Sequence, residues 1–155
     1  MKKETDPVTD DEWLLRRVFV DKFNTSRVPL ISPKAFEPRV NGRDPDITGI
    51  SLYRLSCLST PHQVLQGIPS EKRHNSGVVK LQVIAVSSLD TLRLTIRNDS
   101  RPPIPGHVVI PELNSSSYSK ARPSFTPTLL ALAKLASENE NIVILPTALQ
   151  ANDEK

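Results

Sequence analysis

Prolines are the feature of this sequence that most limits how it can fold. Fourteen prolines stand against only five glycines in 155 residues. Because proline fixes its own φ angle and has no backbone N–H, it interrupts helices and central strands and stiffens the connections between them. A chain of this length can bury one core without disulfides or metals. We therefore expect a single domain over residues 1–155, with short elements joined by long Pro-rich loops.

Several segments have the composition of β-strands. Each is rich in the β-branched, aromatic and other apolar residues that strands favour. They are ISLYRLSCLS (50–59), VVKLQVIAV (78–86), LRLTI (92–96) and HVVIPEL (107–113), and a short extended segment, IVILP (142–146), follows near the C-terminus.

Capping residues mark three helix starts. The stretch TDDE (9–12) is a capping box ahead of WLLRRVFV, which predicts a short helix beginning at Trp13. A Thr-Pro pair opens TPHQVLQG (60–67), and another opens TPTLLALAKLASENEN (126–141), the strongest helical pattern in the chain. Because strands and short helices alternate without regular βαβ spacing, the expected class is α+β, with a small mixed or antiparallel sheet.

Three segments are expected at the periphery: an acidic N-terminal segment (1–12), a flexible Ser-rich loop at about 114–124, and a frayed tail at 147–155. The N-terminal segment lacks the apolar run of a secretory signal, and no segment approaches the roughly 20 apolar residues that span a bilayer. The single Cys57 rules out an internal disulfide, and its apolar neighbours favour a buried thiol. We expect a soluble cytoplasmic protein that does not bind membranes.

Basic residues are concentrated in the body of the chain. Residues 13–137 hold 17 of the 20 Lys and Arg but only 8 of the 17 Asp and Glu, an excess of nine positive charges. Such an excess attracts an anionic partner, whether a nucleic acid, a phosphate ligand or an acidic protein surface. The alternative, to which we give equal weight, is that these basic residues are spread over loops, where they only contact solvent or pair with nearby acidic residues.

Motifs of the common enzyme classes are absent from the sequence. It contains no phosphate-binding glycine loop, no H-E-x-x-H and no nucleophile elbow. Its three histidines, His62, His74 and His107, are far apart in sequence and have no carboxylates at ligand spacing. We therefore expect no metal site and no cofactor.

Arginines in the first third of the chain are the main candidates for binding, because their guanidinium groups grip phosphate or carboxylate with two hydrogen bonds. They are Arg16, Arg17, Arg27, Arg39, Arg43 and Arg54. The loop RVNGRDPD (39–46) contains turn dipeptides and nearly balanced charges, so a solvated loop before a strand is its favoured interpretation.

Four residues are retained as candidate binding residues: Arg17, Tyr53, Arg54 and His107. Arg54 is preferred because it lies beyond the charged loop and beside Tyr53 on a predicted strand. His107 begins another predicted strand, where it either points into a cleft or meets solvent at the strand edge. No catalytic residue is assigned.

The order of several short motifs resembles a group of short bacterial proteins of unknown function. The motif residues are Arg16 and Arg17; Ser32, Ala35, Phe36 and Pro38; Ile50 to Arg54; Thr60 and Pro61; Gly77 and Val78; and Pro105, His107 and Ile110. The similarity extends over residues 13–113, with differences at GISLYR and in the Ser-rich segment after Glu112. It implies a bacterial, cytoplasmic protein and carries no activity.

Three functional hypotheses follow. The first is a small bacterial interaction or adaptor module, such as a subunit of a multi-protein system, that docks a protein partner through its basic surface. The second is a nucleotide-dependent transferase-like enzyme, which resembles ADP-ribosyltransferases in having Arg, Ser and Tyr on early strands; Glu112 is then the nearest candidate for a catalytic glutamate. The third is a nucleic-acid binder that contacts the phosphate backbone, although an aromatic content of 5% disfavours single strands.

Overall fold

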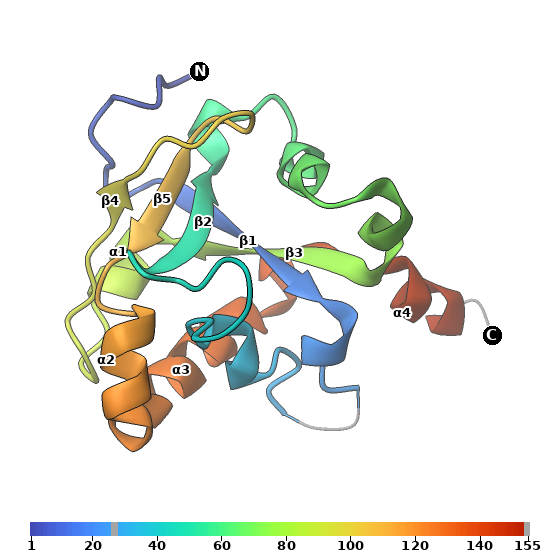
Figure 1. Ribbon diagram of the computed structural model, residues 1–155. Helices are drawn as coiled ribbons and strands as arrows, with labels where there is room; N and C mark the ends of the chain where they lie inside the picture. The colour runs from blue at the N-terminus through green and yellow to red at the C-terminus, as the bar shows by residue number, and fades with distance from the viewer. Residues whose placement is uncertain (26–27, 154–155) are drawn as a thin grey trace.

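The computed structural model describes residues 1–25 and 28–153 and has an α+β fold built on an antiparallel sheet (Figure 1). Within these residues the sheet has six strands in the order β4-β5-β2-β1-β3-β6. The strands are β1 (Trp13–Phe19), β2 (Ile50–Arg54), β3 (Ser76–Gln82), β4 (Arg97–Asn98), β5 (His107–Ile110) and β6 (Ile142–Ile144). The expected fold class is thereby confirmed, and the sheet is antiparallel throughout.

Strand β1 lies in the middle of the sheet, so the helix predicted from Trp13 is wrong. It pairs with β3 along its whole length and with β2 on its other side. The Thr9 N–H donates to Glu12 Oε2 at 2.8 Å, as in a capping box, but the Glu12 N–H donates to the carbonyl oxygen of Thr9 at 3.1 Å and closes a turn ahead of the strand. Pairing on both sides outweighs this local helix-start pattern.

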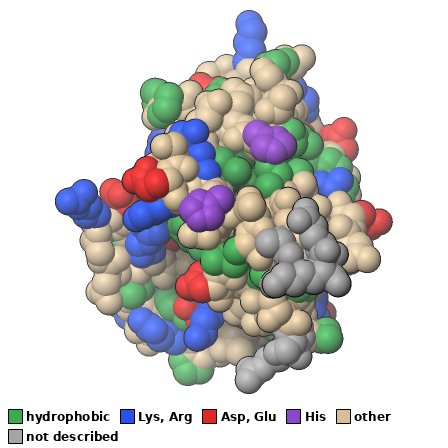
Figure 2. All heavy atoms as spheres, turned by 90° about the vertical axis from the view of Figure 1, so that its right-hand side faces the viewer, with side chains coloured by type: hydrophobic (Ala, Val, Ile, Leu, Met, Phe, Trp, Pro, Cys, Tyr) green, Lys and Arg blue, Asp and Glu red, His purple; other side chains and the backbone are tan. Residues whose placement is uncertain are grey.

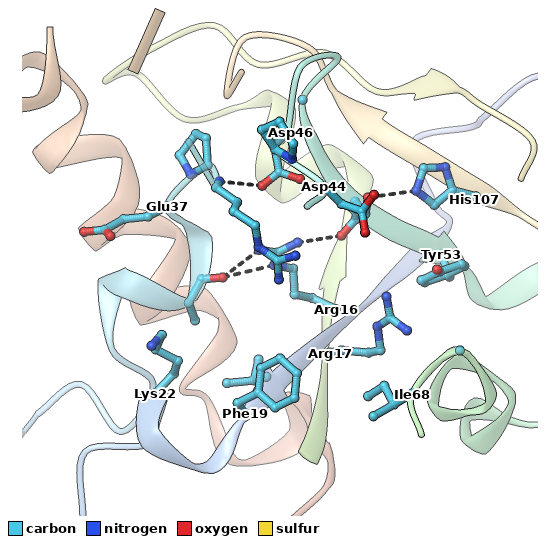
Figure 3. A pocket seen from close by; sticks show the side chains of 18 of the residues that line it. Arg16, Arg17, Phe19, Lys22, Glu37, Asp44, Asp46, Tyr53, Ile68 and His107 are labelled. Carbon is cyan, nitrogen blue, oxygen red and sulfur yellow. Dashed lines mark hydrogen bonds between the residues drawn. The ribbon is translucent and has the colours of Figure 1, made fainter. Parts of the chain in front are cut away.

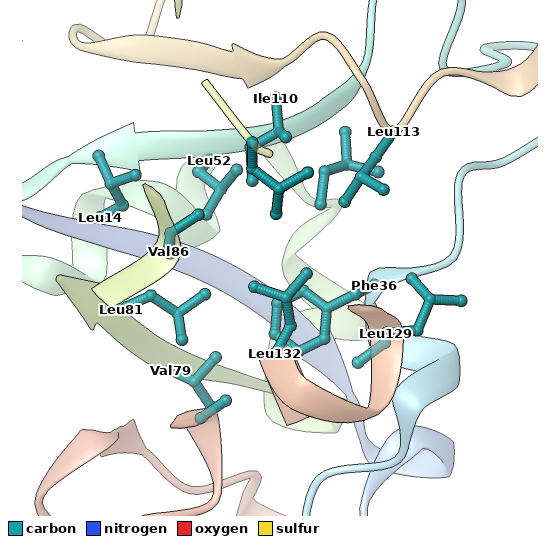
Figure 4. Packing of buried hydrophobic residues seen from close by; sticks show 14 of the residues in the cluster. Leu14, Phe36, Leu52, Val79, Leu81, Val86, Ile110, Leu113, Leu129 and Leu132 are labelled. Carbon is teal, nitrogen blue, oxygen red and sulfur yellow. The ribbon is translucent and has the colours of Figure 1, made fainter. Parts of the chain in front are cut away.

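Alternation along the central strands sends side chains to two faces of the sheet. Leu14 and Val18 of β1 and Leu52 of β2 contribute to the larger hydrophobic cluster, whereas Leu15 and Tyr53 contribute to a smaller one. The larger cluster lies between the sheet and helix α3 (Arg122–Ala136), as Figure 4 shows. This face holds most of the core.

The smaller cluster is covered by the 3₁₀ segment Pro61–Gly67, and a second 3₁₀ segment, Ser70–Asn75, follows it; both lie on the right of the sheet in Figure 1. Val64, Leu65 and Ile68 pack there against the sheet. The predicted short helix at 60–67 is thus present in 3₁₀ form, with Thr60 at its N-cap position as expected. These segments cover only part of the second face.

Short helices complete the described chain. They are α1 (Val83–Ser87), α2 (Ser115–Lys120), α3 (Arg122–Ala136) and α4 (Thr147–Asp153), and further 3₁₀ segments are Val20–Lys22, Pro33–Phe36, Leu55–Cys57 and Asn139–Asn141. None of the helices in the described ranges has the length and apolar content needed to cross a membrane.

Helix α2 replaces most of the flexible loop predicted at about 114–124. The Asn114 side chain caps it by accepting a hydrogen bond from the Ser117 N–H at 2.9 Å. Tyr118 is buried, and its ring meets that of Phe125 edge-on, with centroids 5.7 Å apart. Burial of this one aromatic residue orders a stretch whose composition suggests a loop.

Helix α3 begins at Arg122, so Pro127 lies inside it and does not mark its start as predicted. Phe125, Leu129, Leu132 and Ala136 recur at helical spacing and are all buried. Their burial outweighs the hydrogen bond lost at Pro127, because each fully buried large apolar side chain contributes about 1.5–3 kcal/mol.

Two strand predictions need correction, and the tail is more ordered than expected. Residues 83–87 leave the predicted strand to form α1, and the strand predicted at 92–96 is replaced by β4 at Arg97–Asn98. Of the tail predicted to be frayed, Thr147–Asp153 forms α4, and residues 154–155 lie outside the described residues.

Candidate anion-binding cleft

A cleft of about 1010 Å³ opens over the second face of the sheet. Its floor is formed by Arg17 of β1, Ser51 and Tyr53 of β2, and His107 of β5. One wall is the loop at 34–49, and the other is made by residues 67–72, where the two 3₁₀ segments join. Figure 3 shows Arg16, Arg17, Tyr53 and His107 together in this region.

The structure therefore brings together three of the four residues retained from the sequence. Tyr53 pairs directly with His107 across β2 and β5, and their rings meet edge-on at a centroid distance of 5.3 Å. The Arg17 guanidinium lies over the Tyr53 ring, 5.6 Å from its centroid, and donates to the carbonyl of Val64 at 3.3 Å. Cation–π contact and this hydrogen bond hold the positive charge in the cleft.

Arg16 lines the cleft from the loop side. Its Nε and Nη2 donate to the carbonyl of Ala35 at 3.0 and 2.9 Å, and its Nη1 donates to the carbonyl of Ser51 at 2.7 Å. Burial lowers the pKa of this guanidinium to about 10, with Asp46 opposing the shift, so Arg16 stays charged at neutral pH. It fastens the loop to β2 while its charge remains unpaired by any described carboxylate.

More cations stand along the cleft than anions. Beyond Arg16 and Arg17, the basic lining residues are Lys22, Lys34, Arg39, Arg43, Lys72 and Arg101, and the acidic ones are Glu37, Asp44 and Asp46. Lys22 pairs with Asp21 at 2.9 Å and Arg101 with Asp99 at 2.8 Å, but no described carboxylate lies within 4.0 Å of the other basic residues. Figure 2 shows Lys and Arg side chains gathered along one side of the face turned toward the viewer, with acidic side chains among them.

The fold therefore places the nearly neutral loop at 39–46 in a region of net positive charge. The loop's own charges nearly cancel, but β1, the 3₁₀ segment at 70–75 and the turn at Arg101 add cations from distant parts of the sequence. The loop enters β2 at Gly49, where φ is +125° and a Cβ atom would collide with the carbonyl of Ile110. A glycine is required here because the loop passes so close to β5.

His107 is a buried residue of the cleft floor, and both of its ring nitrogens are hydrogen-bonded. Nδ1 lies 2.6 Å from the carbonyl oxygen of Asp99, and Nε2 lies 2.8 Å from Ser51 Oγ. Burial lowers the pKa of His107, and Arg101 and Arg17 act in the same direction against two opposing contributions from Asp99. The imidazole is therefore neutral at pH 7. The sequence left open whether His107 points into a cleft or meets solvent at the strand edge. In the structure His107 is buried and lines the cleft.

Arg54 does not line the cleft, which corrects its selection as the preferred binding residue. Its side chain is fully buried, and its Nε and Nη2 donate to Glu12 Oε1 and Oε2 at 2.8 and 2.9 Å. It also donates to the carbonyls of Asp6 and Pro7. Arg54 is the anchor of the N-terminal segment, and strand alternation points it away from the face that Tyr53 occupies.

Glu112 also lies outside the cleft. Its carboxylate accepts hydrogen bonds from the N–H and hydroxyl of Thr95, at 2.8 and 2.6 Å. Cys57 is buried, as its neighbours indicated, and burial raises the pKa of its thiol. Neither residue is placed to act on a ligand bound over the sheet. Arg27, another of the arginines considered above, lies outside the described residues.

Ser51 is a residue of the cleft that the sequence did not single out, and Arg16, one of the candidate arginines, is not among the four residues retained. Ser51 is two positions from Tyr53 on β2, so the same alternation that places Tyr53 on the floor also places Ser51 there. Residues from separate motifs of the bacterial resemblance contact each other here, since Arg16 binds the Ala35 carbonyl and Ser51 binds His107.

No group of three or more His, Cys, Asp or Glu side chains within the described ranges is arranged to hold a metal ion. Comparison of the chain with protein-family models, with curated proteins and with solved structures finds no match.

Proposed function

We propose that this chain is a nucleotide-dependent transferase-like enzyme that binds the phosphates of a nucleotide in the cationic cleft. The observation that carries the proposal is the gathering of eight Lys and Arg and only three Asp and Glu around one concavity. Concave sites favour small ligands, and a volume of about 1010 Å³ accommodates a dinucleotide. Guanidinium groups that the fold already holds in place lose little conformational entropy when they bind phosphate.

Apolar groups at one end of the cleft suit the base of such a ligand. Phe19 lines the cleft and is 42% exposed, and Ile68 lines it from the opposite wall. In Figure 3 both lie on the side of the cleft away from Asp46 and His107. An exposed aromatic face next to cations is the arrangement that stacks a base while phosphates are neutralised.

The strand positions agree with the second hypothesis drawn from the sequence. Arg17, Ser51 and Tyr53 lie on neighbouring strands β1 and β2, and they face the same cleft. Because Glu112 is elsewhere, His107 on β5 is the titratable group that the floor offers in its place. The proposal therefore assigns no role to a glutamate.

Docking of an acidic protein segment is the second candidate function, and one observation favours it. Ile47 is 71% exposed at the rim of the cleft, beside basic residues of the same loop. An exposed apolar side chain within a basic rim is a feature of protein-binding surfaces. Under this proposal the chain is an adaptor, and the cleft holds carboxylates of the partner.

Equilibrium binding separates these functions. The test titrates the full chain with ATP, NAD⁺, inorganic phosphate, a poly-glutamate peptide and a DNA oligonucleotide in isothermal calorimetry. The proposal expects a mononucleotide or dinucleotide to bind with a stoichiometry of one, and the variant Arg43→Gln/Lys72→Gln to weaken binding at least tenfold. Arg93→Gln is the matched control, because Arg93 is exposed and does not line this cleft.

Each alternative result points to a different function. Binding of the peptide alone selects the adaptor, and binding of DNA with a steep salt dependence selects the nucleic-acid hypothesis. Nucleotide binding that the Arg43→Gln/Lys72→Gln variant retains in full contradicts the location proposed for the nucleotide.

A further inference from the structure

Three residues from separate parts of the chain form a hydrogen-bonded relay at the cleft floor. Ser51 Oγ lies 2.8 Å from His107 Nε2, and His107 Nδ1 lies 2.6 Å from the Asp99 carbonyl oxygen. A carboxylate oxygen of the same Asp99, Oδ2, lies 3.4 Å from Nδ1. An oxygen nucleophile, a neighbouring base and a third group that orients the base are the parts of an activated serine.

The direction of the hydrogen bonds follows from the chemistry of the partners. The Asp99 carbonyl oxygen can only accept, so in neutral His107 the proton resides on Nδ1. Nε2 then has a free lone pair, and the Ser51 hydroxyl is the donor to it. Ser51 Oγ therefore points its proton at the base and keeps its lone pairs for the cleft.

Accessibility divides the roles of the two side chains. Ser51 is half-buried and lines the cleft, whereas the His107 side chain is only 2% exposed. A ligand in the cleft therefore meets the serine oxygen first, and the imidazole acts behind it. Charged groups near the imidazole are Asp99 and Arg101 from the loop before β5 and Arg17 from β1.

Positive charge is already in place around the serine. Arg16 Nη1 binds the carbonyl of Ser51 itself, at 2.7 Å, and Arg17 lies over the ring of Tyr53 on the same strand. Fixed cations of this kind stabilise negative charge that develops on a reacting group, and they need no reorganisation during the reaction.

We propose that Ser51 is a catalytic nucleophile, that His107 is its general base, and that the electrophile is a phosphorus atom of a nucleotide phosphoester or phosphoanhydride. The choice of a phosphorus electrophile rests on the proposed function, because the cationic cleft is what would draw the phosphate group to Ser51. Asp99 is a positioning residue that holds the imidazole tautomer.

The reaction balances without an oxidant or reductant. Ser51 Oγ forms a bond to phosphorus as the bond from phosphorus to the leaving oxygen breaks, and the serine proton passes to His107 Nε2. His107 then gives this proton to the leaving oxygen, which leaves a phosphoserine ester. In the second half, His107 takes a proton from water or from an acceptor hydroxyl, whose oxygen attacks phosphorus. Ser51 Oγ departs and recovers the proton.

An alkyl fluorophosphonate tests the nucleophile separately from nucleotide binding, because it offers a phosphorus electrophile with fluoride as its leaving group. The full chain is incubated with the reagent, and the modified residue is located by peptide mass spectrometry. The proposal expects one adduct, on Ser51, with none in Ser51→Ala. Ser119→Ala is the matched control, since Ser119 is exposed on α2 and lies outside the cleft.

His107→Gln should slow labelling of Ser51 by at least about 100-fold, as removal of a general base does. Labelling of the unmodified chain is decisive even if this variant fails to fold. No adduct on Ser51, or an adduct only on other hydroxyls, overturns the proposal. Calorimetric nucleotide binding remains an independent readout: binding without Ser51 labelling leaves the proposed function standing, and Ser51 labelling without nucleotide binding leaves the nucleophile standing.

Discussion

Arg54 and Glu12 form a buried ion pair with two hydrogen bonds, which joins the N-terminal segment to β2. The two donor–acceptor distances are 2.8 and 2.9 Å, and the side chains are 0% and 3% exposed. Ser56 Oγ donates to the same carboxylate at 2.6 Å. Since both charges are fully paired where water is excluded, loss of one partner leaves the other uncompensated.

Glu12→Gln should therefore destabilise the protein by about 3–5 kcal/mol, the usual cost of breaking a buried pair from one side. Urea denaturation monitored by circular dichroism gives the free energy of unfolding. Glu71→Gln is the matched control, because Glu71 is exposed in a 3₁₀ segment and should change stability by less than about 0.5 kcal/mol. Equal stability of the two variants would contradict the anchoring role.

Stability should also fall in acid through Glu12. Burial opposes ionisation, but hydrogen bonds from Arg54, Ser56 and Thr9 lower the pKa of this carboxyl from 4.5 to about 2. Because the folded-state pKa is below the unfolded one, the contribution is complete above about pH 5 and is lost as the pH falls from there to about 2. Urea midpoints across this range should decline more steeply in the wild type than in Glu12→Gln.

Arg16→Lys should weaken nucleotide binding although the charge is kept. Lysine cannot reproduce the forked contacts with the Ala35 and Ser51 carbonyls, so the loop at 34–49 loses its fastening to β2. We expect about a tenfold loss of affinity in calorimetry, since a hydrogen bond from a charged group contributes about 1.5–3 kcal/mol. Unchanged affinity, with faster proteolysis of the loop, would restrict Arg16 to a structural role.

Labelling of Ser51 should depend on pH through His107. The base acts only when neutral, and burial holds the pKa of His107 below its usual 6.5. The labelling rate should therefore be constant from pH 8 down to the ordinary histidine range and fall only below it. If the labelling rate already falls to half at a pH above 6.5 as the pH is lowered, a group other than His107 acts as the base.

Much of the sheet could be predicted because several strands have an amino-acid composition that is typical of strands. β2 and β5 fall within segments whose β-branched and aromatic content favours strands, and β3 overlaps such a segment over residues 78–82. β1 was not predicted, because WLLRRVFV fits a helical and an extended pattern equally and its pairing partners are 38 and more residues away. α2 was missed because Tyr118 is the only residue of that helix whose burial stabilises it.

The candidate site was predicted in part for a related reason. Arg17, Tyr53 and His107 were chosen for their chemistry, and the register of the sheet brings them together. Arg54 was preferred because it is adjacent to Tyr53 in sequence, but consecutive residues of a strand face opposite sides of the sheet. Ser51, two positions from Tyr53, is the neighbour that faces the same side. The pairing of Arg54 with Glu12, 42 positions earlier, follows only from the path of the N-terminal segment.

The location of a bound nucleotide tests the proposed function most directly. The full chain is crosslinked with 8-azido-ATP, with and without excess unlabelled ATP, and the modified peptides are identified. We expect adducts that ATP suppresses and that map to the cleft, in β1 near Phe19, in the loop at 34–49 or at residues 67–72. Adducts confined to other surfaces, or unaffected by excess ATP, would contradict the proposed function.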